Sequence, residues 1–502
     1  MFKKSSIGVI VLTLMVSLMI FAVPASAQQD TITVASSQDC KTLDPLFFSN
    51  THPERSVGHH FFDGLVWREP NGEVAPNLAT SWKMIDDYTW EFKLREGVKF
   101  HNGEPFNAEA VKYTFERIMN DELQGRDSMP SQTTLKEVKV VDEYTVRFIT
   151  EEKAPTMLYW LAESMIVAPE HYSSNDLDYL SSNPVGTGPY KFEEWQRGSR
   201  IVMSKFEDYW GENPDAERII WRNIPETSTR IAELTTGNID IAVGVPPDQI
   251  ESVKTENSDL APVEGLRKYF VGMPLTNPKL ESTKVRRALN YAVDVETLIE
   301  TLASGYGERL SYVINPPNNN KDLEAYEYNP EKARELLAEA GYEEGFSIDL
   351  YTTGGTQYFD ERQLSVAIAS YLNEVGLDVT VKSMEESTFR ENLFSREFDD
   401  LFLVGFGALI NPMVEAMLFE TEFLDNVCSY SNPEYDELVN KANSTMDRDE
   451  RIDLINKAEE IVWNDPPWLY LWQPYSFYGI SEELEWEPRP DDWLILNDAE
   501  IE

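Results

Sequence analysis

Two closely spaced glycines make NPVGTGPYKF, at residues 183–192 of this 502-residue chain, the first candidate for a functional loop. Gly186 and Gly188 could belong to a loop whose backbone amides bind a phosphate group. Such a loop places Lys and then Ser or Thr after its last glycine and continues as a helix. Here Pro189 and Tyr190 follow, and the next residues alternate in polarity as in a β-hairpin. The glycines therefore indicate a turn into a strand, and no phosphate site is predicted.

Metal binding and nucleophilic catalysis have little support in the sequence. The chain has two cysteines, Cys40 and Cys428, and five scattered histidines, whose spacing matches no structural zinc motif. The segments G-x-S-x-G and H-E-x-x-H are absent, and with 88 acidic residues paired carboxylates carry no information about acid–base catalysis. We therefore predict no enzymatic activity, no cofactor and no metal. The two cysteines could form a disulfide or remain buried free thiols, and both readings stay open.

A binding site is predicted instead where a series of alternating strands and helices ends. The last strand of the series, FDDLFLVGFG at residues 398–407, is apolar along Leu401–Val404, as expected for a strand that is covered on both faces. It ends at Gly405-Phe406-Gly407. Ligands of open parallel sheets bind beyond the carboxyl ends of the strands, so this glycine-flanked aromatic residue is a natural contact.

The elements that position this strand end follow from periodicity and capping residues. Asn329 and Pro330 begin a helix that ends at Gly341. The elements expected after it are a strand at 346–353, a helix at about 360–375, a strand at 377–384, a short helix near 386–394 and the strand at 398–407. The order strand–helix–strand–helix–strand predicts a parallel sheet with right-handed crossovers.

An earlier part of the chain has a different pattern. Alternating residues predict two strands with buried faces, and a helix capped by Asn107 lies between them. The residues expected to be buried are Trp90, Phe92 and Leu94 in the first strand, Val111, Phe115 and Ile118 in the helix, and Tyr144, Val146 and Phe148 in the second strand. We therefore expect an α+β domain over about residues 67–184.

The N-terminus has the pattern of an export signal. Lys3 and Lys4 precede an apolar run from Ile7 to Val23, and Ala25-Ser26-Ala27 offers a small-residue cleavage site. An uncleaved anchor helix is the alternative, because the run is nearly long enough to span a membrane. We expect cleavage after Ala27 and a soluble protein outside the cytoplasmic membrane, in the periplasm.

Length and charge limit the remaining possibilities. A chain of 502 residues exceeds one compact core, so two or three domains are expected. The net charge of −45 repels nucleic acids and anionic lipids, so we expect no nucleic-acid partner. One hypothesis for the excess of acid is adaptation to a saline environment, where screening weakens self-repulsion, and a generic acidic surface is the alternative.

The order of several segments resembles the extracytoplasmic solute-binding proteins of ABC importers, family 5, which includes peptide-, glutathione- and nickel-binding types. The resemblance spans nearly the whole chain beyond the signal. Its segments are TLDPLFF, FDGLVWREPNGEVAPNLATSW, YTWEFKLREGVKFHNGEPFNAEAVKYTFERI, PVGTGPYKFEEWQRGSRIVMSKFEDYWG, TRIAELTTGNIDIA, VRRALNYAVDVETLI, NPEKARELLAEAGY and ERIDLINKAEEIVWNDPPWLYL. Together they are specific for the family and much less specific for its ligand.

The resemblance implies an α/β fold, a two-lobed periplasmic-binding-protein-like clamshell of type II with an additional α+β insertion domain. The implied parts are a signal peptide at 1–27, a discontinuous lobe I at 28–66, 185–264 and 475–502, the insertion at 67–184, and lobe II at 265–474 with the βαβαβ unit. The glycine turn at residues 183–192 is then the point where the chain returns from the insertion to lobe I.

The resemblance also implies that the backbone of a ligand lies as an added strand between two segments of the protein. Tyr269 and Phe270 would add an aromatic wall, and Arg267 could meet a ligand carboxylate. The implied ligand-binding residues are Ser49, Asn50, Thr51, Arg267, Tyr269, Phe270, Gly405, Phe406, Gly407, Ala408 and Leu409. A strand end for the glycines and a solvated surface position for Arg267 are the structural alternatives.

Leu409 departs from the family pattern, because many peptide binders have an Asp there that pairs with the ligand ammonium. This departure disfavours a simple dipeptide with a free amine and leaves glutathione-like or blocked peptides. The implied function is the substrate-binding component of an ABC importer, a monomeric receptor that delivers a small peptide-like ligand to the permease transmembrane subunits. An oligosaccharide receptor with stacking tryptophans is the alternative, an exported hydrolase is a more distant one, and nickel binding has the least support.

Overall fold

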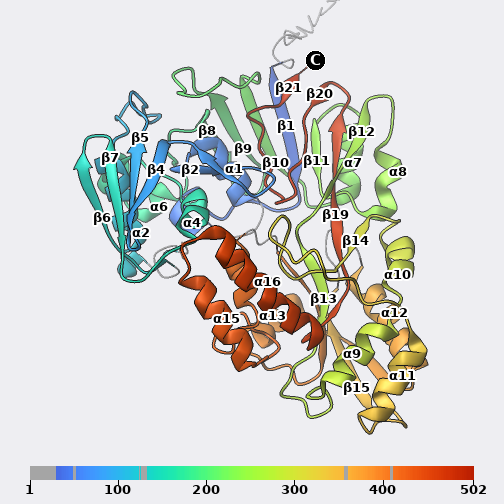
Figure 1. Ribbon diagram of the computed structural model, residues 1–502. Helices are drawn as coiled ribbons and strands as arrows, with labels where there is room; N and C mark the ends of the chain where they lie inside the picture. The colour runs from blue at the N-terminus through green and yellow to red at the C-terminus, as the bar shows by residue number, and fades with distance from the viewer. Residues whose placement is uncertain are drawn as a thin grey trace, which may run out of the picture.

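The computed structural model describes residues 30–48, 53–123, 125, 133–354, 360–407 and 411–501, so the expected signal peptide lies outside the described residues. The chain folds into two lobes, with a third α+β body beside the first lobe (Figure 1). The expected α/β clamshell with an insertion is confirmed. Among the described residues, no helix combines the length and the apolar character that crossing a membrane requires.

Lobe I is built on a mixed sheet in the order β12-β19-β11-β1-β10-β9-β8, and β14 also pairs with β19. Its strands are β1 (Thr31–Ser36), β8 (Tyr190–Gln196), β9 (Arg200–Lys205), β10 (Arg218–Asn223), β11 (Ile241–Val243), β12 (Ser258–Glu264) and β19 (Trp472–Ser481). β14 (Gly307–Arg309) comes from the lobe II part of the chain and pairs with the start of β19. Helical elements near this sheet are η2 (Pro45–Phe47), α1 (Glu54–Phe61), α7 (Thr227–Thr235), η4 (Pro247–Gln249) and α8 (Ile250–Val253). Two short pairs, β2 (Val66–Arg68) with β3 (Val74–Pro76) and β20 (Leu484–Glu485) with β21 (Glu500–Ile501), complete this part. The predicted hairpin after the glycine segment is confirmed as β8 and β9, with Gly198 at φ +73° in its turn.

The insertion is an antiparallel sheet in the order β4-β5-β7-β6 that packs against α2. Its elements are β4 (Ala79–Asp86), β5 (Thr89–Leu94), α2 (Ala108–Ile118), η3 (Asp121–Leu123), β6 (Leu135–Asp142), β7 (Thr145–Thr150), α4 (Met157–Glu163), α5 (Pro169–Ser174) and α6 (Leu177–Leu180). The predicted cap is confirmed, because the Asn107 side chain accepts hydrogen bonds from the amides of Glu109 and Ala110. Phe92, Phe115 and Phe148 are fully buried in one core, as the alternation of both strands predicts.

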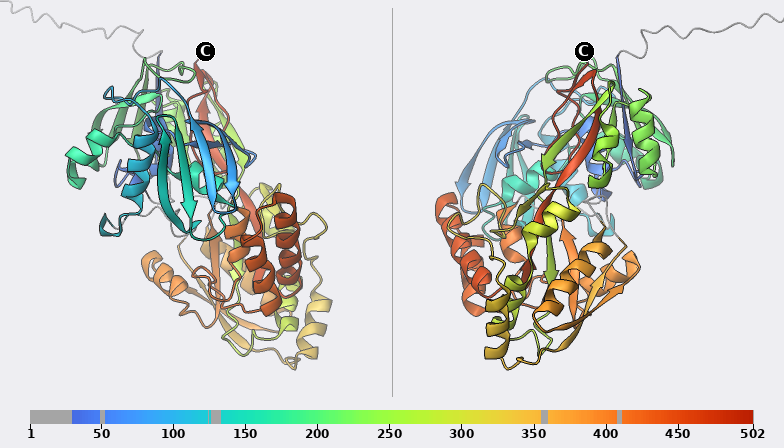
Figure 2. Two further views of the ribbon diagram at one scale, coloured as in Figure 1. Left: turned by 60° about the vertical axis from the view of Figure 1, so that its left-hand side comes forward. Right: turned by 90° about the vertical axis from the view of Figure 1, so that its right-hand side faces the viewer.

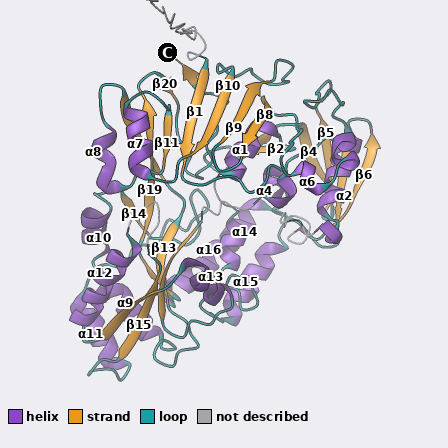
Figure 3. Cartoon of the chain, turned by 180° about the vertical axis from the view of Figure 1, so that it is seen from behind, coloured by secondary structure: helices purple, strands orange, loops and turns teal. Residues whose placement is uncertain are grey.

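Lobe II is built on a sheet in the order β16-β15-β17-β13-β18, flanked by helices on both sides (Figure 3). Its strands are β13 (Lys268–Gly272), β15 (Ser347–Thr352), β16 (Asp378–Ser383), β17 (Leu401–Phe406) and β18 (Trp468–Tyr470). Its helices are α9 (Thr283–Ala292), α10 (Val295–Leu302), α11 (Pro330–Glu339), α12 (Glu361–Glu374), α13 (Glu386–Phe394), α14 (Pro412–Met417), α15 (Pro433–Asn443) and α16 (Arg448–Asn464). The predicted βαβαβ unit is confirmed, since β15 runs parallel to both β16 and β17. Asn329 caps α11 as expected, by accepting a hydrogen bond from the Lys332 amide.

The chain passes between the two lobes along two neighbouring strands. β12 in the lobe I sheet leads directly into β13 in the lobe II sheet, and β18 leads directly into β19. β12 and β19 are antiparallel partners, and Gly265 donates a backbone hydrogen bond to the carbonyl of Pro474 at 3.2 Å where the pair leaves lobe I. Figure 2 shows both strands running together toward the second lobe. Two short adjacent crossings of this kind are where lobes of a clamshell rotate about a hinge.

The glycine segment at residues 183–192 forms a turn into β8, as the sequence predicts, and it also packs closely against α1. A Cβ atom on Gly188 would lie 2.6 Å from the carbonyl oxygen of His60, and one on Gly186 would lie 2.2 Å from that of Phe61. The Gly188 amide donates to the Phe61 carbonyl at 3.0 Å. His101 of the insertion donates from Nε2 to the Gly188 carbonyl at 2.9 Å. The glycines are therefore needed because the turn lies directly against the end of α1.

The buried His60 and the half-buried His101 in this region make the folded state sensitive to acid. Burial lowers the pKa of His60 to about 4 and that of His101 to about 4. His60 donates from Nδ1 to the Ser56 carbonyl at 2.8 Å, and its Nε2 accepts from the Leu496 amide at 3.3 Å. Protonation at Nε2 would remove the acceptor for the Leu496 amide in the C-terminal segment. The folded state is therefore stable with the neutral form of the His60 ring.

We therefore expect the free energy of unfolding to fall as the pH drops from about 6.5 toward 4. A folded pKa below the unfolded value gives stability that is present above the unfolded pKa and is lost in acid, by about 3 kcal/mol for a group such as His60. Urea unfolding between pH 7 and pH 4 should show a shallower loss for His60→Gln, whose side-chain carbonyl still accepts from Leu496. Equal slopes for the two proteins would contradict this account.

The two cysteines are free thiols in separate cores. Cys40 is buried with the lobe I core, and Cys428 is buried with a lobe II core. Burial raises the pKa of both thiols, which keeps them protonated and poorly reactive. Of the two readings that the sequence leaves open, the structure has the buried free thiols.

Candidate ligand-binding site

The carboxyl end of β17 brings together Arg267, Tyr269 and Gly405. β13 and β17 are antiparallel neighbours, with Tyr269 directly opposite Gly405. A Cβ atom on Gly405 would lie 2.6 Å from Cζ of the Tyr269 ring, so the ring lies over the glycine. Arg267 donates from Nη1 to the Gly405 carbonyl at 3.0 Å. This hydrogen bond fixes a half-buried guanidinium at the edge of the sheet.

Phe406 lies on the opposite face of the same strand. Its half-buried ring packs edge-on against Phe270 at 5.2 Å and against Trp468 at 6.0 Å between centroids. Phe270 itself stacks on Trp468 at 3.6 Å and is fully buried. Tyr269 is also buried, with 1% of its surface exposed. Tyr269 and Phe270 point to opposite faces of β13 and belong to two different buried clusters of lobe II, so both faces of the strand are covered. Tyr269 and Phe270 therefore support the strand end from within the core, and Phe406 and Arg267 are the partly exposed side chains.

Gly407 is the exposed residue at this strand end. The nearest atom to a Cβ built on Gly407 is Nη2 of Arg267, at 3.8 Å. Gly405 and Gly407 thus serve different purposes, because the first accommodates the Tyr269 ring and the second leaves open space beside a cationic group. An exposed glycine backbone beside a cationic side chain suits a peptide-like ligand, whose main chain can lie against the glycine and whose carboxylate can pair with the cation.

A buried carboxylate that the sequence analysis missed lies beside this group. Glu361, the first residue of α12, is 4% exposed and accepts a hydrogen bond from the Thr353 hydroxyl just after β15. Tyr269 also donates a hydrogen bond to this carboxyl. Burial raises the pKa of Glu361, while those two hydrogen bonds and the positive charge of Arg267 lower it in part. β15 and β17 are parallel, so their carboxyl ends lie at the same edge of the sheet. The position of Glu361 after the predicted strand at 346–353 was therefore the signal in the sequence that could have placed this residue near the site.

A buried ion pair supports the Phe406 face. Lys268 lies directly opposite Phe406 in the β13–β17 register and pairs with Glu415 of α14, with Nζ 2.5 Å from Oε1. The other carboxylate oxygen of Glu415 accepts from the Asn315 amide at 2.8 Å. Lys268 and Glu415 are both almost fully buried. Removing one partner of such a pair typically costs about 3–5 kcal/mol, because the other charge is left buried and unpaired.

Five of the predicted site residues fall outside the described part of the chain. Ser49, Asn50 and Thr51 on the lobe I side, and Ala408 and Leu409 after the strand, stay predictions. Within the described ranges, no cluster of three His, Cys, Asp or Glu side chains is arranged to hold a metal ion.

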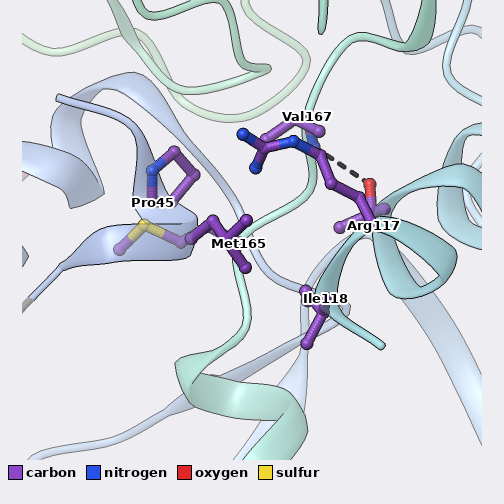
Figure 4. Close-up of a pocket in the computed structure, with 7 residues that line it drawn as sticks. Pro45, Arg117, Ile118, Met165 and Val167 are labelled. Atoms are coloured by element: carbon purple, nitrogen blue, oxygen red, sulfur yellow. Dashed lines mark hydrogen bonds between the residues drawn. The ribbon is translucent and has the colours of Figure 1, made fainter. Parts of the chain in front are cut away.

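The hollow in Figure 4 lies elsewhere, between η2 of lobe I and α2 of the insertion. It has about 250 Å³ of empty space, open solvent included, and is lined by Pro45, Thr114 and Arg117 among others. Its polar groups already have partners. Arg117 forms two hydrogen bonds to the buried carboxylate of Asp44, and the Thr114 hydroxyl accepts from the Val167 amide at 3.2 Å. We therefore interpret it as a packing defect and not as the ligand site.

The two lobes, the paired crossings and the strand-end site define the class of extracellular solute-binding proteins. Residues 73–420 match the family described as bacterial extracellular solute-binding proteins, family 5 Middle, and the chain belongs to this family. It is 29% identical to the glutathione-binding protein GsiB of Salmonella typhi and 27% identical to the dipeptide-binding protein of Escherichia coli K12, each over 96% of both chains. It is also similar to the solved periplasmic binding protein DppA of Helicobacter pylori in complex with the peptide STSA. That similarity has a TM-score of 0.77 and 25% identity, over 94% of this chain and 99% of the other.

Proposed function

We propose that this protein captures a small peptide or peptide-like solute, of oligopeptide, dipeptide or glutathione type, between its lobes and delivers it intact to an ABC permease. The observation that carries the proposal is the strand end at Gly405-Phe406-Gly407, where open backbone lies beside the Arg267 guanidinium. An added ligand strand gains affinity from main-chain hydrogen bonds, and its carboxylate gains a charge-assisted partner in Arg267. The named ligands of the relatives, glutathione and dipeptides, have both features.

Closure of the two lobes around the bound ligand is the second step of the proposed mechanism. A ligand that touches both lobes favours the closed arrangement by its differential affinity for that state. The two adjacent crossings, β12 to β13 and β18 to β19, leave few backbone angles to change during closure. Arg267 lies in the first crossing, next to β13, so closure and binding of the ligand carboxylate involve the same short segment.

The oligosaccharide alternative has less support, because most of the tryptophans proposed for stacking belong to the core. Trp463, Trp468 and Trp472 are 6%, 2% and 0% exposed, which leaves no face for a sugar ring. The half-exposed Trp195 is covered by the Arg197 guanidinium at 3.8 Å. Among the described aromatic residues at the strand end, only the half-buried Phe406 presents a ring near the site.

Native mass spectrometry of the freshly purified protein tests the proposal. We expect a co-purified species with the mass of a short peptide or thiol peptide, released without change after long incubation. Calorimetric titration with glutathione and with short peptides after removal of bound ligand should then give a dissociation constant in the micromolar range or below, roughly −8 kcal/mol or more favourable. A sugar mass would favour the alternative receptor, and cleavage of the bound peptide would indicate a hydrolase; either result would refute the proposal.

A further inference from the structure

The carboxylate of Glu361 lies among the groups that hold the proposed ligand-binding arginine. Glu361 is connected to β13 through Tyr269 and to the end of β15 through Thr353. Tyr269 lies over Gly405, whose carbonyl accepts from Arg267. A continuous set of contacts therefore joins the carboxylate to the guanidinium, and the two opposite charges also act on each other directly.

We propose that Glu361 is a specificity-determining residue, which sets how strongly Arg267 binds an anionic group of the ligand and makes this binding depend on pH. The inference deepens the proposed function and rests on it, because it concerns the same strand-end site. When Glu361 is ionised, its charge offsets part of the positive potential of Arg267. When Glu361 is protonated, the full charge of Arg267 is available to a ligand carboxylate.

The surroundings of Glu361 favour uptake of a proton at a higher pH than an exposed glutamate requires. Burial raises its pKa, and the negative charge of Glu386 on α13 raises it further. Arg267 and the hydroxyls of Thr353 and Tyr269 act in the opposite direction. The two hydroxyls can remain hydrogen-bonded to a protonated carboxyl group, so the local contacts need not break when the proton is taken up.

The expected signature is a change in the preference for a carboxylate over a neutral amide. The probes are N-acetyl-trialanine and its C-terminal amide, which differ only in that group. The ratio of their affinities should increase as the pH falls from 8 toward 5, because the raised pKa of Glu361 lets it take up a proton before the peptide carboxylate does. The increase should be about tenfold, the effect of one screened charge at short range.

Glu361→Gln isolates the charge, because the glutamine carbonyl still accepts from the hydroxyls of Thr353 and Tyr269. We expect its preference for the acid at pH 8 to be about tenfold above that of the unmodified protein and nearly constant with pH. The matched control is Glu374→Gln, an exposed glutamate at the other end of α12, which should change the ratio less than twofold. Arg267→Gln should bring the two affinities close together.

The outcomes separate this inference from the proposed function. Binding of both probes with a ratio that is constant between pH 8 and 5 in the unmodified protein would overturn the role of Glu361 alone. A lower melting temperature of Glu361→Gln with an unchanged ratio would show that Glu361 only holds the fold, and it would overturn the inference too. If neither probe binds, then the proposed peptide function fails and the inference fails with it.

Discussion

Gly188→Ala should destabilise the protein by about 3 kcal/mol or more, as overpacking against atoms that cannot move does. The added Cβ would lie 2.6 Å from the carbonyl oxygen of His60 and 2.6 Å from the carbonyl carbon of Phe61. Both are backbone atoms at the end of α1, and the Gly188 amide is hydrogen-bonded to the same Phe61 carbonyl. Relief of the clash requires the turn to move away from α1, which would also break the His101 contact to the Gly188 carbonyl.

Urea unfolding followed by tryptophan fluorescence measures this loss. Gly354→Ala is the matched control, because a Cβ at Gly354 meets no atom of the described residues within 4 Å and the residue has no positive φ. The control should be neutral or slightly stabilising, since alanine restricts the unfolded chain. If the two alanine variants unfold at the same urea concentration, then the close approach of the turn to α1 is wrong.

The alternation of apolar residues was sufficient to predict most local elements of the fold. Phe92 and Phe148 are buried as their period-two strands require, and Asn107 and Asn329 cap helices whose first turns follow the expected rules. The partner of the glycine turn could not be predicted in the same way. Gly188 meets His60 and Phe61, which are more than a hundred positions earlier, and no local pattern carries that information.

The sequence predicted where the candidate site lies, but not which of its side chains are buried and which are exposed. The glycines around Phe406 and the apolar strand before them indicated the strand end, and the resemblance added Arg267. Period two places Tyr269 and Phe270 on opposite faces of β13, but it does not say that both faces are covered, since that depends on residues distant in sequence that pack on each face. Glu361 had only its position after the strand at 346–353 to distinguish it among 88 acidic residues, and the fold was needed to place it beside the end of β15.

Gly407→Val is expected to weaken peptide binding by about a hundredfold while the protein remains folded. The fold tolerates the change because Gly407 is exposed and has no positive φ, and among the described residues only Arg267 Nη2 lies near its Cβ position, at 3.8 Å. The ligand should not tolerate it, because an added strand lies about 4.8 Å from its neighbour and the branched side chain would occupy that approach. A hundredfold loss corresponds to about 2.7 kcal/mol, the scale of two or three main-chain hydrogen bonds.

Calorimetry with N-acetyl-trialanine, together with a melting curve, distinguishes the two effects of that substitution. Gly407→Ala is the graded control and should lose less affinity, because a single methyl group intrudes less than the branched side chain. Gly405→Ala should behave in the opposite way, with a lower melting temperature, because its Cβ would collide with the buried Tyr269 ring at 2.6 Å. If a folded Gly407→Val protein binds the peptide as well as the unmodified protein does, then the ligand does not run along this strand end. The roles proposed for Arg267 and Glu361 would then be wrong as well.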